Sequence, residues 1–142
     1  MKKRVSSRAV IIENGKILVI FRRKLEEGKI SEYYVIPGGG KEENETLEEN
    51  VKRELYEEMN IKIDIIGYLG KYESNSTIEH YFHCKIKEGT PILSGEEKNR
   101  MSGKNYYEIR FEDINNLKKL KLAAENKVIM ATEKKYENRK NH

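Results

Sequence analysis

The amino-acid sequence predicts a fold of the α/β or α+β class, built on a mixed β-sheet. Short apolar segments typical of strands share the chain with a long amphipathic helical segment, and neither an internal repeat nor an interdomain linker separates them. The chain has 142 residues, which is enough for one hydrophobic core but short for two. We therefore expect residues 1–142 to form a single domain.

Composition narrows the classes of function. Hydrophobic and charged residues each make up 37% of the chain. The net charge is +4, and positive and negative residues are interspersed. This weak basicity does not by itself indicate a nucleic-acid-binding protein. The single cysteine, Cys84, cannot form an internal disulfide, which fits a reducing compartment.

The N-terminal segment Lys2–Arg4 is not followed by an apolar run of the signal-peptide type, and no segment is long enough to span a bilayer. A soluble cytoplasmic protein is the expectation. It would have no membrane partner and no specific nucleic-acid partner, and a homodimer is left open.

The first predicted element is a β-hairpin. Its strands cover residues 4–12 and 16–23, and Asn14-Gly15 between them predicts a two-residue turn because both residues tolerate positive φ. The second strand ends in Arg22 and Arg23. Charged residues that close a strand usually lie in solvent, but this strand leads toward a glycine-rich segment. A contact from Arg22 or Arg23 to a substrate phosphate is therefore the alternative.

A glycine-rich segment precedes the helix. Residues 24–32 are polar and predict a surface loop, and Tyr33–Ile36 predicts a short strand that ends at Pro37. Gly38-Gly39-Gly40 then predicts a turn with unusual backbone freedom. Three glycines directly before an acidic helix favour a close approach of the backbone to a ligand over a merely flexible turn.

The helix is predicted to begin near Thr46 and to end near Asn60. Thr46 and Glu49 have the spacing of a capping box, and Asn is often found in the left-handed conformation that ends a helix. Apolar residues recur every four positions and predict the buried stripe; these are Leu47, Val51, Leu55 and Met59.

After the helix, the pattern predicts strands at Ile61–Ile66, with an extension through Tyr72, at Thr77–Ile86 and at Tyr106–Phe111. The other predicted segments are a turn at 74–76, a polar loop at 88–103, a short helix or turn at 112–120 and a terminal helix at 123–136.

Three glutamates of the helix are expected to share one face. At about 100° per residue, Glu54, Glu57 and Glu58 fall within one quadrant, beside the apolar stripe. Like charges this close to a core destabilise the helix, and a divalent cation would offset that cost. Oxygen ligands without His or Cys indicate Mg²⁺ or Mn²⁺ rather than zinc. A solvated glutamate-rich face is the alternative, and the glycine segment, the cap and Arg53 together weigh against it.

The segment Gly39–Ile61 resembles the Nudix box, G-x5-E-x7-R-E-U-x-E-E-x-G-U, where U is apolar. The matching residues are Gly39, Glu45, Arg53, Glu54, Leu55, Glu57, Glu58 and Ile61. Asn60 stands where the family has glycine. This departure is mild, because asparagine also accepts the left-handed conformation that ends a helix.

The resemblance implies a Nudix fold, in which a mixed sheet lies between helices and the box forms a loop–helix–loop. It also implies hydrolysis of a small-molecule substrate, a nucleoside diphosphate linked to another moiety, with Mg²⁺ or Mn²⁺. By the same resemblance Glu54, Glu57 and Glu58 would be metal ligands. Gly39, Gly40, Glu45 and Arg53 would shape the loop and orient the glutamates, so that Arg53 joins Glu54 and Glu57 in catalysis. The general base stays open between Glu54, Glu57 and a later glutamate such as Glu96 or Glu97. The resemblance also makes Glu96 and Glu97 candidates for an extra metal ligand or a substrate contact, and solvated loop charges are the alternative for both.

Other constellations are weaker. His80, His83 and Cys84 resemble a zinc site, but strand alternation places His83 on the face opposite the other two, so ordinary strand residues are expected. Core or rim packing is expected for the aromatic residues Tyr33, Tyr34, Tyr81 and Phe82. Stacking of one of them on a base or sugar is the alternative.

The alternative function is a catalytically silent Nudix-like module that binds a nucleotide for regulation, and the intact box carboxylates weigh against it. An RNA-decapping role finds little support in a charge of +4.

Overall fold

A computed structural model describes residues 2–95, 98 and 101–115. Within these residues the chain forms seven strands and one helix. The elements are β1 (Arg4–Glu13), β2 (Lys16–Glu26), β3 (Lys29–Val35), β4 (Gly38–Gly40), α1 (Leu47–Met59), β5 (Lys62–Glu73), β6 (Thr77–Glu88) and β7 (Asn105–Asp113). The predicted terminal helix at 123–136 lies outside the described residues, as does most of the predicted helix or turn at 112–120.

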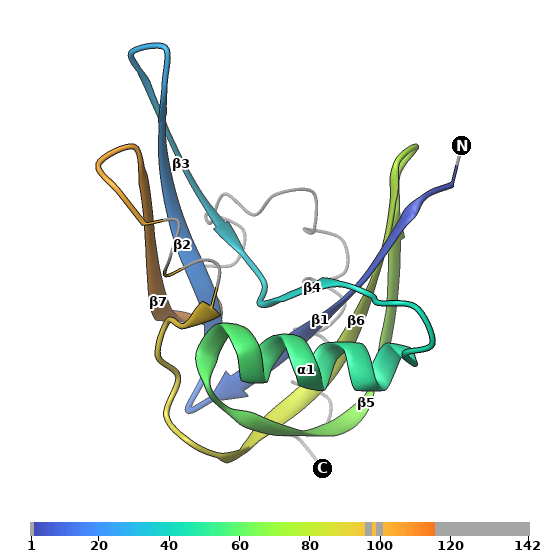
Figure 1. Ribbon diagram of the computed structural model, residues 1–142. Coiled ribbons are helices and arrows are strands. Elements are labelled where there is room, and N and C mark those ends of the chain that lie inside the picture. The colour runs from blue at the N-terminus through green and yellow to red at the C-terminus, as the bar shows by residue number, and fades with distance from the viewer. Residues whose placement is uncertain (1, 96–97, 99–100, 116–142) are drawn as a thin grey trace.

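The strands form a mixed sheet, as predicted. Its order is β3-β2-β1-β6-β5, with β4 paired to β1 and β7 paired to β2. The β1–β6 pair is parallel and the other pairs are antiparallel. Figure 1 shows α1 lying across the sheet, with the β2–β3 hairpin and β7 on one side and β1, β5 and β6 on the other. This arrangement confirms the α+β class.

The first hairpin confirms the turn prediction. Asn14 and Gly15 have φ values of 52° and 75°, and the flanking residues pair as Glu13↔Lys16. Two residues with positive φ match the right-handed twist of the strands.

The prediction of a surface loop at residues 24–32 is wrong. Strands β2 and β3 continue through this segment and meet at a second tight turn, Glu27-Gly28, where φ is 50° and 77°. The strands pair from Lys24↔Ser31 to Glu26↔Lys29. Their side chains here are exposed on both faces, so no alternation of apolar and polar residues marks them as strands.

The glycine segment is a strand, and not the turn that was predicted. Gly38–Gly40 form the short strand β4, which pairs antiparallel with Ser6–Arg8 of β1. Gly38 has a φ of 151°, and a Cβ atom there would collide with the carbonyl oxygen of Ser7. The glycines therefore let two backbones pack closely, and the segment is fixed in place.

Helix α1 follows the prediction closely. The Thr46 hydroxyl accepts from the Glu49 N–H at 3.0 Å, and the Glu49 carboxylate accepts from the Thr46 N–H at 2.8 Å, which completes a capping box. Asn60 ends the helix with φ 56° and ψ 38°, the left-handed conformation expected there.

Two apolar cores lie on opposite faces of the sheet. The core under α1 includes Val51, Leu55 and Met59 packed with Ile11 and Leu18. The core on the other face includes Val10, Ile17, Val19, Ile36 and Tyr81. Neighbouring residues of one strand thus pack in different cores, because successive side chains of a strand point to opposite faces of the sheet.

Two further observations bear on the predictions. Glu112 and Asp113 belong to β7, where they pair with Ile17 and Lys16, and not to a helix. None of the helical segments in the described residues has the length and apolar character needed to cross a lipid bilayer.

Candidate active site

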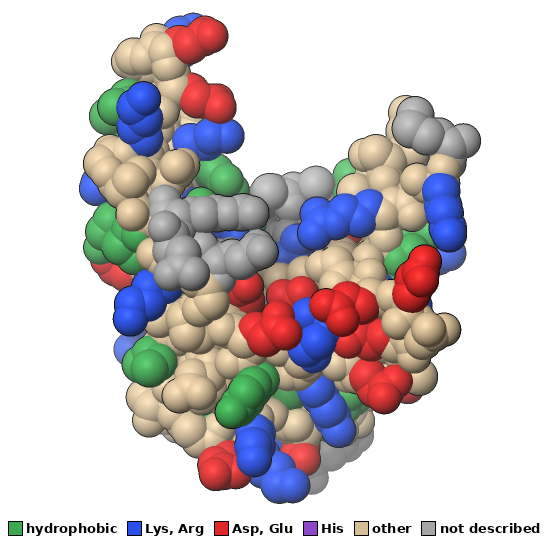
Figure 2. All heavy atoms as spheres, in the orientation of Figure 1, with side chains coloured by type: hydrophobic (Ala, Val, Ile, Leu, Met, Phe, Trp, Pro, Cys, Tyr) green, Lys and Arg blue, Asp and Glu red, His purple; other side chains and the backbone are tan. Residues whose placement is uncertain are grey.

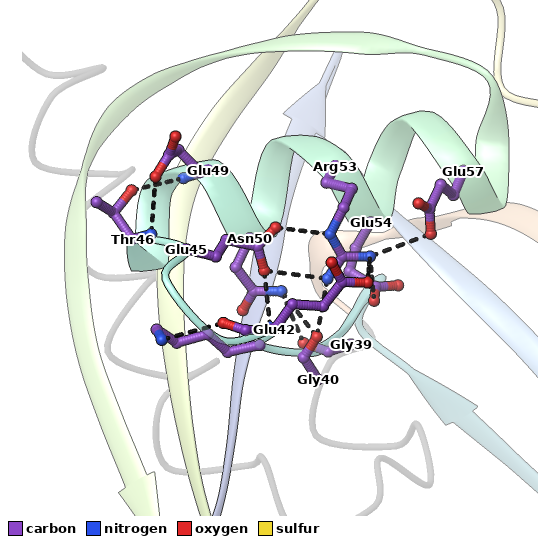
Figure 3. Close-up of polar contacts among 11 residues, drawn as sticks. Gly39, Gly40, Glu42, Glu45, Thr46, Glu49, Asn50, Arg53, Glu54 and Glu57 are labelled. Carbon is purple, nitrogen blue, oxygen red and sulfur yellow. Dashed lines mark hydrogen bonds and ion pairs between the residues drawn. The ribbon is translucent and has the colours of Figure 1, made fainter.

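Strand β4 is attached to α1 through polar side chains of the helix. Asn50 is fully buried, and its Nδ2 donates to the carbonyl oxygens of Gly39 at 3.3 Å and Gly40 at 3.1 Å. Arg53 Nη2 donates to the same Gly40 carbonyl at 3.0 Å. Figure 3 shows these donors pointing from the helix to the glycine strand. The glycine backbone is therefore held between β1 on one edge and α1 on one face.

Arg53 connects the acidic residues of this region (Figure 3). Its Nε and Nη2 donate to the two carboxylate oxygens of Glu45 at 2.6 and 3.1 Å. Its Nη1 lies 3.2 Å from Glu54 Oε1 and 3.1 Å from Glu57 Oε2. Glu45 in turn accepts from the Glu42 N–H at 3.0 Å. Because the guanidinium hydrogen bond lowers the pKa of Glu45, this carboxylate stays ionised and keeps the loop before α1 closed.

The predicted metal-ligating glutamates differ in their surroundings. The Glu54 side chain is only 13% exposed, whereas that of Glu57 is 52% exposed. Burial raises the pKa of Glu54, and Arg53 partly opposes that rise. A Cβ atom on Gly39 would lie 2.5 Å from Glu54 Cδ, so only glycine leaves room for this carboxylate. Glu54 is therefore a desolvated carboxylate pressed against the glycine strand.

The glycine strand and the acidic face of α1 border a cavity of about 540 Å³. All three glutamates of the predicted metal site line it. Among the residues that the structure describes, its acidic residues are Glu42, Glu54, Glu57 and Glu58, and its basic residues are Arg4, Arg8, Arg22 and Arg53. Figure 2 shows the carboxylates gathered at the edge of a hollow between the two arms of the sheet.

The two arginines at the end of β2 have different positions. Arg22 lines the cavity, and its guanidinium lies 5.4 Å from the centre of the Tyr107 ring. Arg23 faces away from the cavity, with its guanidinium 4.9 Å from the centre of the Tyr106 ring. The structure therefore places Arg22, and not Arg23, in the lining of the cavity.

The donors fit a divalent cation after a local change. Carboxylate oxygens supply the donor set, which suits Mg²⁺ or Mn²⁺, and the desolvated Glu54 lacks a full counter-charge. In the residues that the structure describes, no three acidic, His or Cys groups already converge on one point. Arg53 instead spans Glu54 and Glu57. To share a cation with Glu54, the half-exposed Glu57 would have to leave its contact with Arg53.

The loop after β6 packs on the C-terminal end of α1. Ser94 donates from its N–H to the Glu58 carbonyl at 2.8 Å and from its hydroxyl to the Glu57 carbonyl at 2.6 Å. Gly95 lines the cavity. The candidate residues Glu96 and Glu97 lie outside the described residues.

Comparison with known proteins identifies the family. The model of the NUDIX domain matches residues 2–132. The chain belongs to the Nudix family. An ADP-ribose pyrophosphatase of Methanocaldococcus jannaschii is 32% identical over 111 residues, which cover 78% of this chain and 62% of that protein. A MutT-like protein of Streptomyces ambofaciens is 32% identical over 89 residues, which cover 61% of this chain and 54% of that protein. The chain thus spans less than two thirds of the length of these two relatives.

Solved structures show the same fold. The E. coli ORF135 protein has a TM-score of 0.68 at 21% identity, with 93% of this chain and 89% of that chain covered. A UDP-X diphosphatase has a TM-score of 0.69 at 20% identity, with 98% of this chain and 65% of that chain covered. At these identities the likeness establishes the Nudix fold alone.

Among the described residues, His80, His83 and Cys84 do not form part of a group that could hold a metal ion. His80 Nδ1 lies 2.8 Å from the Tyr68 hydroxyl, and Cys84 is buried in the core under α1. Burial raises the pKa of the Cys84 thiol to about 12, so the thiol is protonated at neutral pH. Both residues are ordinary strand residues, as the alternation predicts.

Sequence reasoning missed three residues that shape the cavity. Asn50 fixes the glycine strand, and Arg4 and Arg8 reach the cavity from β1. Asn50 lies at the helical spacing of the buried stripe, three residues after Leu47, and a polar residue there is a signal for a buried hydrogen bond. No local pattern marks the two arginines.

Proposed function

We propose that this Nudix protein is a metal-dependent pyrophosphohydrolase. It would cleave the phosphoanhydride bond of a nucleoside diphosphate linked to another moiety, by attack of water at phosphorus. One observation carries the proposal: the glutamates of α1, the glycine backbone of β4 and the Arg22 side chain border one cavity. Carboxylates for a cation and arginines for phosphate therefore face the same space.

Glu54, Glu57 and Glu58 would hold Mg²⁺ or Mn²⁺. The bound cation would neutralise phosphoryl oxygens and lower the pKa of a water molecule. The chain positions its own ligands in two ways. Gly39 leaves space for Glu54, which lies enclosed between β4 and Arg53. Arg53, fixed by Glu45 and the Gly40 carbonyl, orients Glu54 and Glu57.

Glu57 is the better supported general base among the described glutamates. Its carboxylate is half exposed at the cavity and is oriented by Arg53 through one oxygen, Oε2, so it would accept the proton of a water molecule through the other oxygen. Glu54 is enclosed and has little room to move. Arg22 would bind a phosphate oxygen of the substrate through the charge-assisted hydrogen bonds that guanidinium groups form with phosphate.

The names of similar proteins support the substrate class. ADP-ribose pyrophosphatase and UDP-X diphosphatase both denote cleavage of a diphosphate attached to a nucleoside. A bond of this chemical type fits a cavity lined by carboxylates and arginines. The charged lining of the cavity fits nucleoside diphosphate derivatives as a class and does not distinguish between members of that class.

An activity screen tests the proposal. Purified protein is assayed with Mg²⁺, with Mn²⁺ and with EDTA on sugar nucleotides, dinucleoside polyphosphates, nucleoside triphosphates and ADP-ribose. We expect turnover that requires the cation and falls by roughly 10²–10⁴-fold in Glu57→Gln, the usual loss on removing a general base. The matched control is Glu88→Gln, an exposed glutamate of β6 that lies outside the cavity lining.

The screen also separates the enzyme from a silent nucleotide-binding module. Tight nucleotide binding in a calorimeter, with no cation-dependent turnover above Glu57→Gln on any member of the panel, would overturn the enzyme proposal in favour of that module.

A further inference from the structure

The last turn of α1 depends on a segment of the chain that lies outside the helix. The last four carbonyl groups of an α-helix have no partner within the helix itself. In α1 the first of these, that of Tyr56, accepts from the N–H of the capping residue Asn60 at 2.9 Å. The other three accept from one segment after β6: the pairs are Met59 with the Ile92 N–H at 3.0 Å, Glu58 with the Ser94 N–H at 2.8 Å and Glu57 with the Ser94 hydroxyl at 2.6 Å. Figure 1 shows this segment passing beside the end of α1 from which β5 begins.

This turn is also the part of α1 where carboxylates are least favourable. The C-terminal end of a helix carries a partial negative charge and favours cations, yet α1 has no basic residue in its last turn. Glu57 and Glu58 place two carboxylates there instead. Because helix ends fray, a turn with these charges needs donors for its carbonyl groups. The segment after β6 supplies them, and it thereby holds the backbone that carries two of the three proposed cation ligands.

Gly95 allows the segment to approach the helix closely. Its φ is 67°, and a Cβ atom at this position would lie 2.8 Å from the carbonyl oxygen of Glu57 and 3.7 Å from Glu58 Oε1. The backbone conformation and the close contact both favour glycine. Ser94 therefore bonds to the backbone of both glutamates, and Gly95 packs directly against them.

We propose that Ser94 is a positioning residue of the cation site. Its hydroxyl and its N–H, together with the close packing of Gly95, fix the last turn of α1 so that the carboxylates of Glu57 and Glu58 can reach the same cation as Glu54. This role rests on the proposed function, because it concerns the same site. Ser94 is not among the described residues that line the cavity, so it acts through the helix backbone and not on the substrate.

Titration with Mn²⁺, followed by electron paramagnetic resonance, measures cation affinity without any need for turnover. Ser94→Ala removes the hydroxyl and keeps the N–H. It should weaken Mn²⁺ binding by about three- to tenfold, the loss that corresponds to one hydrogen bond. Ser94→Thr keeps a hydroxyl at the same position and should restore most of the affinity.

The matched control is Ser74→Ala, in the turn between β5 and β6. The Ser74 hydroxyl lies 2.9 Å from Thr77 Oγ1 and accepts from the Thr77 N–H at 3.1 Å, so this variant also loses hydrogen bonds of a serine hydroxyl. Ser74 is not among the described cavity residues, and Ser74→Ala should leave Mn²⁺ affinity unchanged. Urea unfolding of both variants separates a loss of stability, which both should show, from a loss of cation affinity, which only Ser94→Ala should show.

A second pair of variants tests the same contact through a collision and not through a lost hydrogen bond. Gly95→Ala places a Cβ atom against the Glu57 carbonyl and should weaken Mn²⁺ binding at least as much as Ser94→Ala. Gly28→Ala introduces alanine at a similar φ, 77°, where a Cβ atom meets nothing within 4 Å. It should carry the same backbone strain and leave Mn²⁺ affinity unchanged.

The outcomes separate this inference from the proposed function. Equal loss of Mn²⁺ affinity in Ser94→Ala and Ser74→Ala, or no recovery in Ser94→Thr, would overturn the positioning role. Cation-dependent turnover by the unmodified protein, with unchanged Mn²⁺ affinity in Ser94→Ala, would overturn the positioning role alone. Loss of affinity in Ser94→Ala and recovery in Ser94→Thr, with no turnover of any compound in the panel, would support the positioning role and refute the proposed enzymatic function.

Discussion

Replacing Arg53 by lysine tests whether the guanidinium fork, and not only its charge, organises the active site. Arginine presents a rigid planar set of donors, whereas the lysine ammonium is a point charge on a flexible stem. Arg53 contacts both oxygens of Glu45, the Gly40 carbonyl, Glu54 and Glu57. A lysine at this position can keep one or two of these contacts at a time.

The expected loss of stability follows from the exposure of each contact. Hydrogen bonds to charged groups contribute roughly 1.5–3 kcal/mol each, and exposed ion pairs contribute roughly 0–1 kcal/mol. The Glu45 side chain is 11% exposed and that of Glu57 is 52% exposed, so the pair with Glu45 dominates. Losing one Glu45 contact and the Gly40 contact should lower the free energy of unfolding by about 2 kcal/mol. The melting temperature should then fall by roughly 4–8 °C.

Urea unfolding of Arg53→Lys, Glu45→Gln and the double variant gives the coupling between the two residues. We expect a coupling free energy of at least about 1 kcal/mol, because the residues share two hydrogen bonds. A coupling below about 0.5 kcal/mol, within the usual error of additivity, would refute the reasoning. The turnover of Arg53→Lys should fall even at temperatures where the variant is fully folded, because Arg53 also orients Glu54 and Glu57.

The pH dependence supplies an independent check on the same pair. Arg53 lowers the pKa of Glu45 below its ordinary value of 4.5 in the folded state. The pair therefore adds stability that is fully present above pH 4.5 and is lost as the pH falls through the folded-state pKa. The difference between the unmodified protein and Arg53→Lys should be largest near neutral pH and shrink in acid. A difference that grows as the pH falls would contradict this assignment.

Three other predictions concern single positions. Gly39→Ala should lower kcat/KM at least tenfold by displacing Glu54, whereas Gly103→Ala, where a Cβ meets nothing within 4 Å, should leave kcat/KM unchanged; equal activity of the two variants would contradict the role of Gly39. Burial raises the pKa of Cys84 to about 12, so a thiol reagent should label it only after unfolding in urea, and rapid labelling of the native protein would show the assignment to be wrong. Burial and the nearby Lys71 lower the pKa of His80 below 6.5, so the unfolded state binds this proton more readily and stability should decrease as the pH falls through 6.5. Melting curves of His80→Gln should show a shallower decline between pH 7 and 5, and an unchanged slope would exclude His80 as its source.

The features that were predictable from sequence depend on residues close together in the chain. The turn at Asn14-Gly15, the capping box from Thr46 to Glu49 and the helix end at Asn60 each involve at most four consecutive residues. Their geometry follows from the φ preferences and hydrogen-bonding groups of those residues alone. The grouping of Glu54, Glu57 and Glu58 on one face likewise needs only the helical period.

Some of the missed features depend on contacts between segments that are distant in the sequence. The others lack the alternation of apolar and polar residues that marks a strand. The second hairpin has Glu27-Gly28 at its turn, but both faces of its strands are exposed, so no period of two appears. Strand β4 has no side chains, and only its pairing with β1 defines it. Arg8 reaches the cavity because β1 runs beside β4, although it precedes Arg53 by 45 positions in the sequence.

The glycine strand shows why the local and distant features belong to one site. A strand built from any other residue would place Cβ atoms alternately against Glu54 and against Arg4 or Arg8. Such side chains would fill the space between the carboxylates and the guanidiniums. Glycine at three successive positions keeps both faces open while hydrogen bonds to β1, Asn50 and Arg53 fix the backbone. The rigidity that glycine lacks by itself is thus supplied by its neighbours, so substitutions at Asn50 should reduce activity through β4 although Asn50 does not line the cavity.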